Sequence, residues 1–214
     1  LLLIVCQKVS LEWEIVYMSF KTKGYLIIKN AISKELAKIA YNYLLIKRNA
    51  IAHMRENNYL APFDNNFGTW NDGQVPNTFS IYGDSLMETL LLYVKPKMIK
   101  GTKLKLYETY SYARTYKLGD ILKKHKDRSS CEISTTLFLG GNKWPIYLND
   151  GKKDIKINLN EGDMLIYKGC DLEHWRKPFN GEVCVQVFLH YSTNKKLLND
   201  TRPKLGLNAE FKSI

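Results

Sequence analysis

Residues 103–191 contain a succession of short β-prone segments separated by glycine turns, and this pattern limits the fold more than any other feature. A long aromatic segment, KLKLYETYSYARTYKLG, precedes EISTTLFLGG, WPIYLND, KDIKINL, DMLIYKG and EVCVQVFLHY. The turns between them read GG, NDG, NEGD and NG, which are typical turn sequences. Six or more short strands joined in this way predict an antiparallel sandwich or barrel.

The region before these strands has a different character. Residues 24–30 (GYLIIKN) read as a short strand. Ser33 can cap a helix that continues to about residue 56, because apolar residues recur there at helical spacing. Residues 57–80 are polar and irregular, which predicts a long loop of the kind that often covers a binding site.

A second helix is expected to begin at Asp84 or Ser85 and to continue through Val94. Lys95-Pro96 should end it, because proline disfavours a helical residue before it. Since the helices precede the strands, we expect an α+β fold in which the helices pack outside the β unit.

The composition is that of an ordinary globular protein. Of the 214 residues, 45% are hydrophobic and 25% are charged, which excludes collagen, coiled coil and disorder as the main character. No run approaches the roughly 20 apolar residues of a membrane-spanning helix, so no membrane partner is expected.

The net charge of +11 would attract nucleic acid or small anions. Only six of the 32 basic residues are Arg, however, and the Lys residues are spread along the chain, with the densest group in residues 95–105. Sites that recognise nucleic-acid bases rely on Arg for bidentate hydrogen bonds. A solvated lysine face is therefore preferred, and nucleic acid is kept as an alternative partner.

The cysteines follow no CxxC spacing, which argues against a thiolate zinc site or a redox motif. They are Cys6, Cys131, Cys170 and Cys184. Four cysteines are too few to stabilise a chain of 214 residues as a disulfide scaffold. A reducing, cytoplasmic location is therefore expected.

The apolar start of the chain lacks the basic flank and cleavage site of a signal peptide. Met18 is a candidate natural start. Residues 1–17 are therefore interpreted as an extension or upstream sequence, and residues 18–214 as a single domain.

Two of the four histidines stand in a metal-capable pattern. His125 and Asp127 form an HxD triplet, and on an extended strand residues i and i+2 point to the same side. His174 follows 47 residues after Asp127, just past the predicted strand DMLIYKG. Two His and one carboxylate on one face form the facial triad that binds non-haem Fe(II) and leaves positions open for other ligands.

The order of these features resembles the Fe(II)- and 2-oxoglutarate-dependent oxygenase family. HxD, a run of strands, a GD turn at Gly162-Asp163, the strand MLIYKG and then His174 match the family pattern, and GYLIIKNAISKEL resembles its entry strand and helix. The resemblance covers residues 22–191 and implies a double-stranded β-helix (jelly-roll) core of the prolyl-hydroxylase type.

The resemblance also implies a reaction. Fe(II) would be held by His125, Asp127 and His174, and 2-oxoglutarate would bind the metal as co-substrate. Its oxidative decarboxylation to succinate and CO₂ would drive hydroxylation of a C–H bond. The substrate would be a peptidyl side chain or a small molecule.

The co-substrate anchor departs from the family. Many members carry Arg or Lys nine or ten residues after the distal His, where this chain has Val183 and Cys184. The nearest cation is Arg176, two residues after His174, which could face the same pocket and bind the distal carboxylate of 2-oxoglutarate.

Arg114 is the alternative anchor, on the strand that precedes the HxD triplet. Tyr110 and Tyr112 share its face by parity and could donate hydrogen bonds to the same carboxylate. Asn71 and Asp72 lie in the long loop, where substrate contacts are expected. His190 is interpreted as a structural residue and His53 as an exposed one.

Two other functions are compatible with this fold. One is a non-catalytic, cupin-like protein that binds a metal or ligand, which the missing late basic residue favours. The other is a cupin-type metalloenzyme without 2-oxoglutarate, but such sites usually add a third His near the first, and His125 has none.

Overall fold

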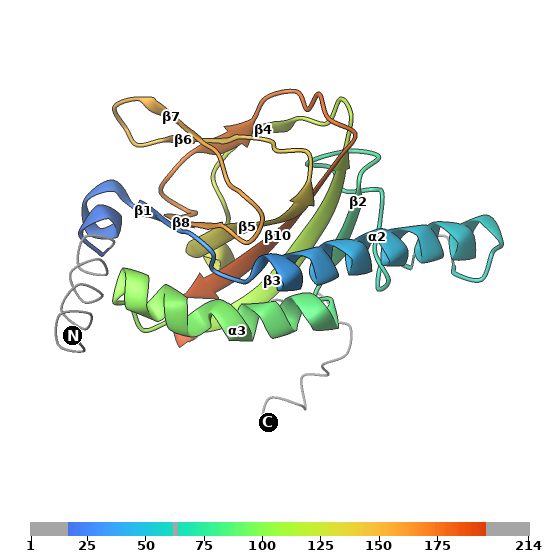
Figure 1. The fold of residues 1–214 in the computed structure, drawn as a ribbon, viewed down its shortest axis with the longest axis horizontal. Coiled ribbons are helices and arrows are strands. Elements are labelled where there is room, and N and C mark those ends of the chain that lie inside the picture. The colour runs from blue at the N-terminus through green and yellow to red at the C-terminus, as the bar shows by residue number, and fades with distance from the viewer. Residues whose placement is uncertain (1–16, 62–63, 196–214) are drawn as a thin grey trace.

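Two antiparallel sheets and two long helices make up the described part of the protein, a computed structural model in which residues 17–61 and 64–195 are described (Figure 1). In chain order the elements are β1 (Tyr25–Ile28), α2 (Lys34–Glu56), β2 (Phe79–Tyr82), α3 (Ser85–Thr102), β3 (Tyr107–Lys117), β4 (Leu122–His125), the 3₁₀ turn η1 (Ser129–Cys131), β5 (Ile133–Gly141), β6 (Ile146–Asn149), β7 (Asp154–Ile157), β8 (Met164–Lys168), β9 (His174–Arg176) and β10 (Val183–Ser192).

The strands form a six-stranded sheet with the order β1-β8-β5-β10-β3-β2 and a four-stranded sheet with the order β4-β9-β6-β7. From β3 to β10 the chain passes repeatedly from one sheet to the other, and in Figure 1 the sheets form two layers. The predicted α+β class and double-stranded β-helix core are confirmed.

Each face of the six-stranded sheet covers its own hydrophobic core, because successive strand residues point to opposite sides. The inner core lies between the sheets and includes Tyr116, Phe138, Leu148, Leu165 and Phe188. The outer core lies under the helices and includes Leu44, Leu91, Leu137, Ile166 and Val187. The six-stranded sheet therefore separates the core between the sheets from the core under the helices.

The two helices cover the outer face of the six-stranded sheet (Figure 1). α2 packs on β5, and α3 packs on β3 and β10. Ser33 caps α2 as predicted, with its hydroxyl accepting a hydrogen bond from Leu36 N at 3.2 Å. Asp84 caps α3 in the same manner, accepting from the backbone N–H groups of Leu86 and Met87.

The predicted end of the second helix at Lys95-Pro96 is wrong. α3 continues through Pro96 to Thr102. Pro96 is exposed, and Leu92, whose carbonyl loses its hydrogen bond, is 59% exposed, so water can hydrogen-bond that carbonyl. Beyond the proline, Met98 is fully buried in the outer core, and its packing favours continuation of the helix.

The loop before β2 and the turn before β8 follow the predictions. The long loop ends where β2 begins at Phe79. Gly162 has φ +81°, and a Cβ there would lie 2.5 Å from the backbone oxygen of Ile32, so this turn requires glycine. Asp163 accepts hydrogen bonds from Asn160 N and Lys29 Nζ. The turn is thereby joined to the segment that leads into α2.

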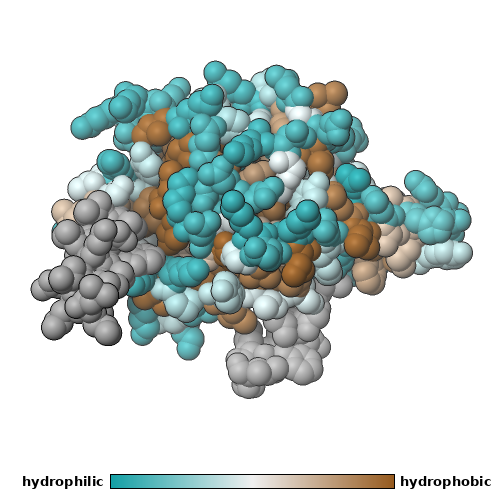
Figure 2. Space-filling view, in the orientation of Figure 1, coloured by the Kyte–Doolittle hydropathy of each residue, from teal (hydrophilic) through white to brown (hydrophobic). Residues whose placement is uncertain are grey.

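Several expectations fall partly outside the described residues. Residues 1–16 and 196–214 lie outside the described ranges, and they include most of the proposed extension and Cys6. Within the described ranges, Cys131, Cys170 and Cys184 are free thiols. None of the described helices has the length and apolar character needed to cross a membrane. Hydrophilic side chains predominate on the face shown in Figure 2.

Candidate metal centre and pocket

The three predicted metal ligands meet at one point between the sheets. β4 and β9 are neighbouring strands, and His125 lies directly opposite His174. Asp127 Oδ1 is 3.7 Å from His125 Nε2 and 3.5 Å from His174 Nε2. Among the described residues, these three form the one group of His, Cys, Asp or Glu side chains placed to share a metal ion.

Backbone carbonyls orient both imidazoles for metal binding. His125 Nδ1 lies 2.8 Å from Lys123 O, and His174 Nδ1 lies 3.1 Å from Leu172 O. Each Nδ1–H donates to its carbonyl, so each Nε2 presents a lone pair toward Asp127. Gln74 Nε2 lies 2.8 Å from His125 Nε2 and donates to that lone pair.

The surroundings of His125 and Asp127 shift their pKa values in the direction that metal binding requires. Burial, followed by repulsion from His174, lowers the pKa of His125, so this imidazole is neutral near pH 7. Burial would raise the pKa of Asp127, but contact with His174, the charge of His190 and the Ser134 hydroxyl hold it well below its ordinary value. Two imidazoles and one carboxylate oxygen form a ligand set that fits a divalent cation such as Fe(II).

A pocket of about 280 Å³ opens beside this group. Tyr110, Tyr112 and Arg114 line it from the inner face of β3, so the three side chains share a face as predicted. His190, Lys126 and the other lining residues surround the same space. The pocket thus joins the metal-capable group to a wall that carries positive charge and phenolic hydroxyls.

Arg114 holds a carboxylate inside this pocket. Its Nη2 donates to Asp72 Oδ2 at 2.7 Å, and the Tyr112 hydroxyl donates to the same oxygen. Arg114 is buried, with 4% of its side chain exposed. Burial raises the pKa of Tyr112 to about 12, so its hydroxyl keeps the proton that it donates. The pair Arg114 and Tyr112 is consequently a working carboxylate site.

Arg176 lies behind the pocket wall. It shares the buried side of β9 with His174, but it is 1% exposed and does not line the pocket. Its Nη1 donates to Trp144 O and its Nη2 to Thr136 Oγ1 at 3.3 Å. Cys184, at the position where many family members carry the cation, is fully buried.

Three buried polar atoms near these arginines find no hydrogen-bond partner among the described residues. They are Arg114 Nε, Arg176 Nε and the hydroxyl of Tyr116. The guanidinium of Arg114 lies 6.0 Å from the centre of the Tyr116 ring. Unpaired buried donors favour an acceptor, and a dicarboxylate such as 2-oxoglutarate would supply several.

The sequence analysis missed three residues of this region. Tyr116 continues the parity of Tyr112 and Arg114, so the same alternation could have identified it. His190, which was interpreted as a structural residue, and Ser134, which was given no role, lie beside Asp127. Their placement depends on strand register, which no local sequence signal gives.

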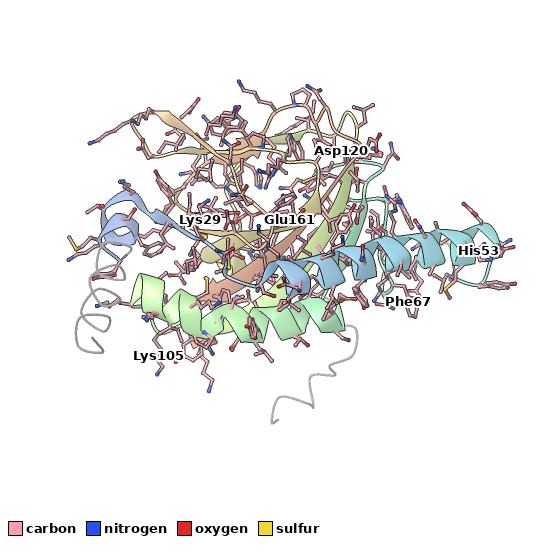
Figure 3. All side chains as sticks on the ribbon, in the orientation of Figure 1. Lys29, His53, Phe67, Lys105, Asp120 and Glu161 are labelled. Atoms are coloured by element: carbon pink, nitrogen blue, oxygen red, sulfur yellow. The ribbon has the colours of Figure 1, made fainter. Side chains whose placement is uncertain are left out.

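The remaining histidine is remote from the site. His53 is exposed near the end of α2, as predicted, and Figure 3 shows it at the tip of that helix, far from the sheets. Gln186 is buried, accepts a hydrogen bond from Thr136 Oγ1 at 3.0 Å and does not line the pocket.

No protein-family model and no curated protein matches this sequence. Solved structures do match. A Pseudomonas putida prolyl-4-hydroxylase superposes with a TM-score of 0.59 and 13% identity over 84% of this chain and 98% of its own. HygX from Streptomyces hygroscopicus, solved with nickel and 2-oxoglutarate, gives 0.58 and 13% over 81% and 84%.

A third structure with the same fold belongs to an enzyme that catalyses a different reaction. The non-haem alpha ketoglutarate-dependent epimerase SnoN from nogalamycin biosynthesis gives a TM-score of 0.64 and 13% identity over 92% of both chains. The chain therefore has the fold of these 2-oxoglutarate-dependent enzymes, and within that fold His125, Asp127 and His174 come together. Because these structures include a hydroxylase and an epimerase, the fold by itself selects no reaction.

Proposed function

We propose that this protein is an Fe(II)- and 2-oxoglutarate-dependent oxygenase that hydroxylates a C–H bond of a peptidyl or small-molecule substrate. One observation carries the proposal: two imidazole Nε2 atoms and one carboxylate oxygen converge beside a pocket whose wall already binds a carboxylate. The catalytic unit is a single domain within residues 18–214.

His125, Asp127 and His174 would hold the metal. Bound Fe(II) would supply O₂ activation coupled to decarboxylation of 2-oxoglutarate to succinate and CO₂. The chain contributes the orientation of its three ligands, and the pocket beside them would receive the other reactants.

Arg114 is the preferred anchor for the distal carboxylate of 2-oxoglutarate. It lines the pocket and holds the Asp72 carboxylate together with Tyr112, whereas Arg176 lies behind the wall with two donors already engaged. Tyr110 lines the same wall and would contribute its hydroxyl. Arg176 is the second candidate for the anchor. Its Nε has no hydrogen-bond partner among the described residues, and a ligand would reach it if the side chains between Arg176 and the pocket moved.

A nucleic-acid substrate is less well supported. The lysine-rich stretch of residues 95–105 belongs to α3 and the segment after it, on the helix side of the six-stranded sheet. Figure 3 shows Lys105 on that side, opposite the four-stranded sheet. These charges would therefore not guide a polyanion into the pocket between the sheets.

An anaerobic titration with Fe(II), with and without 2-oxoglutarate, tests the metal and co-substrate together. We expect a weak visible charge-transfer band that requires both. The band should vanish in His174→Ala and persist in the matched variant His53→Ala, which lies outside the site. A folded protein without the band would contradict the oxygenase proposal and favour a cupin-like binder.

The same titration separates the two anchors. Arg114→Ala should weaken 2-oxoglutarate binding about 10-fold or more, because a charge-assisted hydrogen bond contributes about 1.5–3 kcal/mol. Arg176→Ala should change it less. The reverse order would assign the anchor to Arg176. Succinate release with candidate peptides and small molecules would then identify the substrate class and show whether the product is an alcohol.

A further inference from the structure

The two oxygens of Asp127 have different surroundings. Oδ1 faces both imidazoles of the candidate metal centre. Oδ2 instead accepts a hydrogen bond from Ser134 Oγ at 2.6 Å. The Asp127 side chain is 14% exposed, so water competes weakly for this bond. The carboxylate is consequently arranged to give one oxygen to a metal and to hold the other away from it.

The Ser134 hydroxyl is itself oriented by its neighbours. Ser134 is fully buried on β5, and its Oγ lies 2.9 Å from His190 Nδ1 and 3.0 Å from Cys131 O. A hydroxyl has a single proton, and the short bond to the charged Asp127 favours that carboxylate as its acceptor. The Oγ lone pair then accepts from His190 Nδ1–H. The chain of donors runs from His190 through Ser134 to Asp127.

The neighbouring strands fix the position of His190 in this series of hydrogen bonds. On β10 it lies directly opposite Ser134 of β5 and Tyr110 of β3, and its ring centre is 4.7 Å from that of Tyr110. The register between β10 and β3 shifts immediately after His190, and such bulges often re-aim side chains beside active sites. His190 is 6% exposed. Its orientation is thus set by neighbours on both sides.

Gly169 provides the space for these contacts. A Cβ at this position would lie 2.4 Å from Asp127 Oδ2 and 2.7 Å from Ser134 Oγ. The Gly169 carbonyl also accepts from Asp127 N at 2.9 Å. Any side chain here would separate the serine from the carboxylate.

We propose that Ser134 and His190 are positioning residues that fix Asp127 for one-oxygen metal coordination and thereby set the metal affinity of the centre. This inference rests on the proposed metal site. Groups that orient a metal ligand typically change affinity 10- to 100-fold when removed. His190 thus acts on the metal ligand Asp127 through Ser134.

Calorimetric titration with Co(II), together with the visible Co(II) spectrum, tests the inference without turnover. Ser134→Ala should weaken Co(II) binding about 10- to 100-fold and shift the spectrum, because Asp127 is released. Ser111→Ala is the matched control: this buried Ser of β3 also donates to a carboxylate, Glu88 Oε1 at 2.9 Å, but away from the pocket. It should leave both readouts unchanged.

His190 supplies a second pair of variants. Asn places an amide N–H near the position of imidazole Nδ1, so His190→Asn should keep most of the affinity, whereas His190→Leu should lose about as much as Ser134→Ala. Equal affinity in the two His190 variants, or a Ser134→Ala protein that binds Co(II) like the parent, would overturn the inference. A parent protein that binds no Co(II) would instead contradict the proposed metal site.

Discussion

Asp72 is the residue that most directly controls entry to the proposed anion site. Its Oδ2 accepts hydrogen bonds from Arg114 and Tyr112. Its Oδ1 accepts a hydrogen bond from Gln74 N at 2.7 Å, and this contact shapes the loop. Gln74 in turn donates to His125. One short segment therefore contacts both the candidate anchor and a candidate metal ligand, and a bound dicarboxylate would have to replace the Asp72 contact.

Asp72→Asn should bind 2-oxoglutarate about 3- to 10-fold more tightly than the parent. The amide oxygen can preserve the turn contact with Gln74 N, but the charge that competes for Arg114 is gone, so a larger fraction of the protein is ready to bind. Calorimetric titration of the metal-loaded protein measures the change.

Asp64→Asn is the matched control, because Asp64 makes the same turn contact in the same loop, with Asn66 N at 2.9 Å. It should leave the affinity unchanged. Weaker binding in Asp72→Asn would show that Asp72 holds Arg114 in place and does not compete with the ligand.

Among single residues, the sequence predicted the metal ligands better than the residues that orient them. His125 and Asp127 are two residues apart, so strand alternation placed them together. His174 was located by resemblance to a family pattern. The contacts of Ser134 with His190 and Asp127 arise from the register of β5 and β10, which involves residues 56 positions apart. Periodicity along one segment carries no information about such a pairing.

Among the elements, α3 differs most from its prediction. Local preference would end the helix before Pro96, and tertiary packing of its last turns on the sheet overrides that preference. Most strands from β3 onward were easier to predict because they are short β-prone segments separated by glycine turns, whereas β2, β4 and β9 were not predicted. Their order in two sheets followed only from the resemblance, since alternation does not specify which strands pair.

Pro96→Ala should stabilise the protein by about 1–3 kcal/mol. Alanine restores the N–H that bonds the Leu92 carbonyl, and proline costs about 3 kcal/mol in a helix interior, partly offset by its lower entropy when unfolded. Urea denaturation measures the gain. An unchanged midpoint would mean that the helix at Pro96 gains no hydrogen bond from alanine.

At the scale of the whole molecule, two cores share one sheet but differ in their relation to the site. Leu91 is buried under the helices, whereas Leu148 is buried between the sheets and lies directly opposite His174 on the neighbouring strand. Both leucines are almost completely buried, at 1% and 0% exposure. They therefore offer a matched comparison of stability with ligand placement.

Leu91→Ala and Leu148→Ala should each lower stability by about 2–5 kcal/mol, the usual cost of a buried Leu-to-Ala cavity. Only Leu148→Ala should also weaken Co(II) binding, by about 10-fold, because the cavity lets His174 depart from the orientation that directs Nε2 toward Asp127. Urea denaturation and calorimetry on the same samples separate the two effects. If Leu91→Ala reduced the affinity equally, the metal centre would depend on the overall rigidity of the domain, and the inner core would have no special part in holding the ligands.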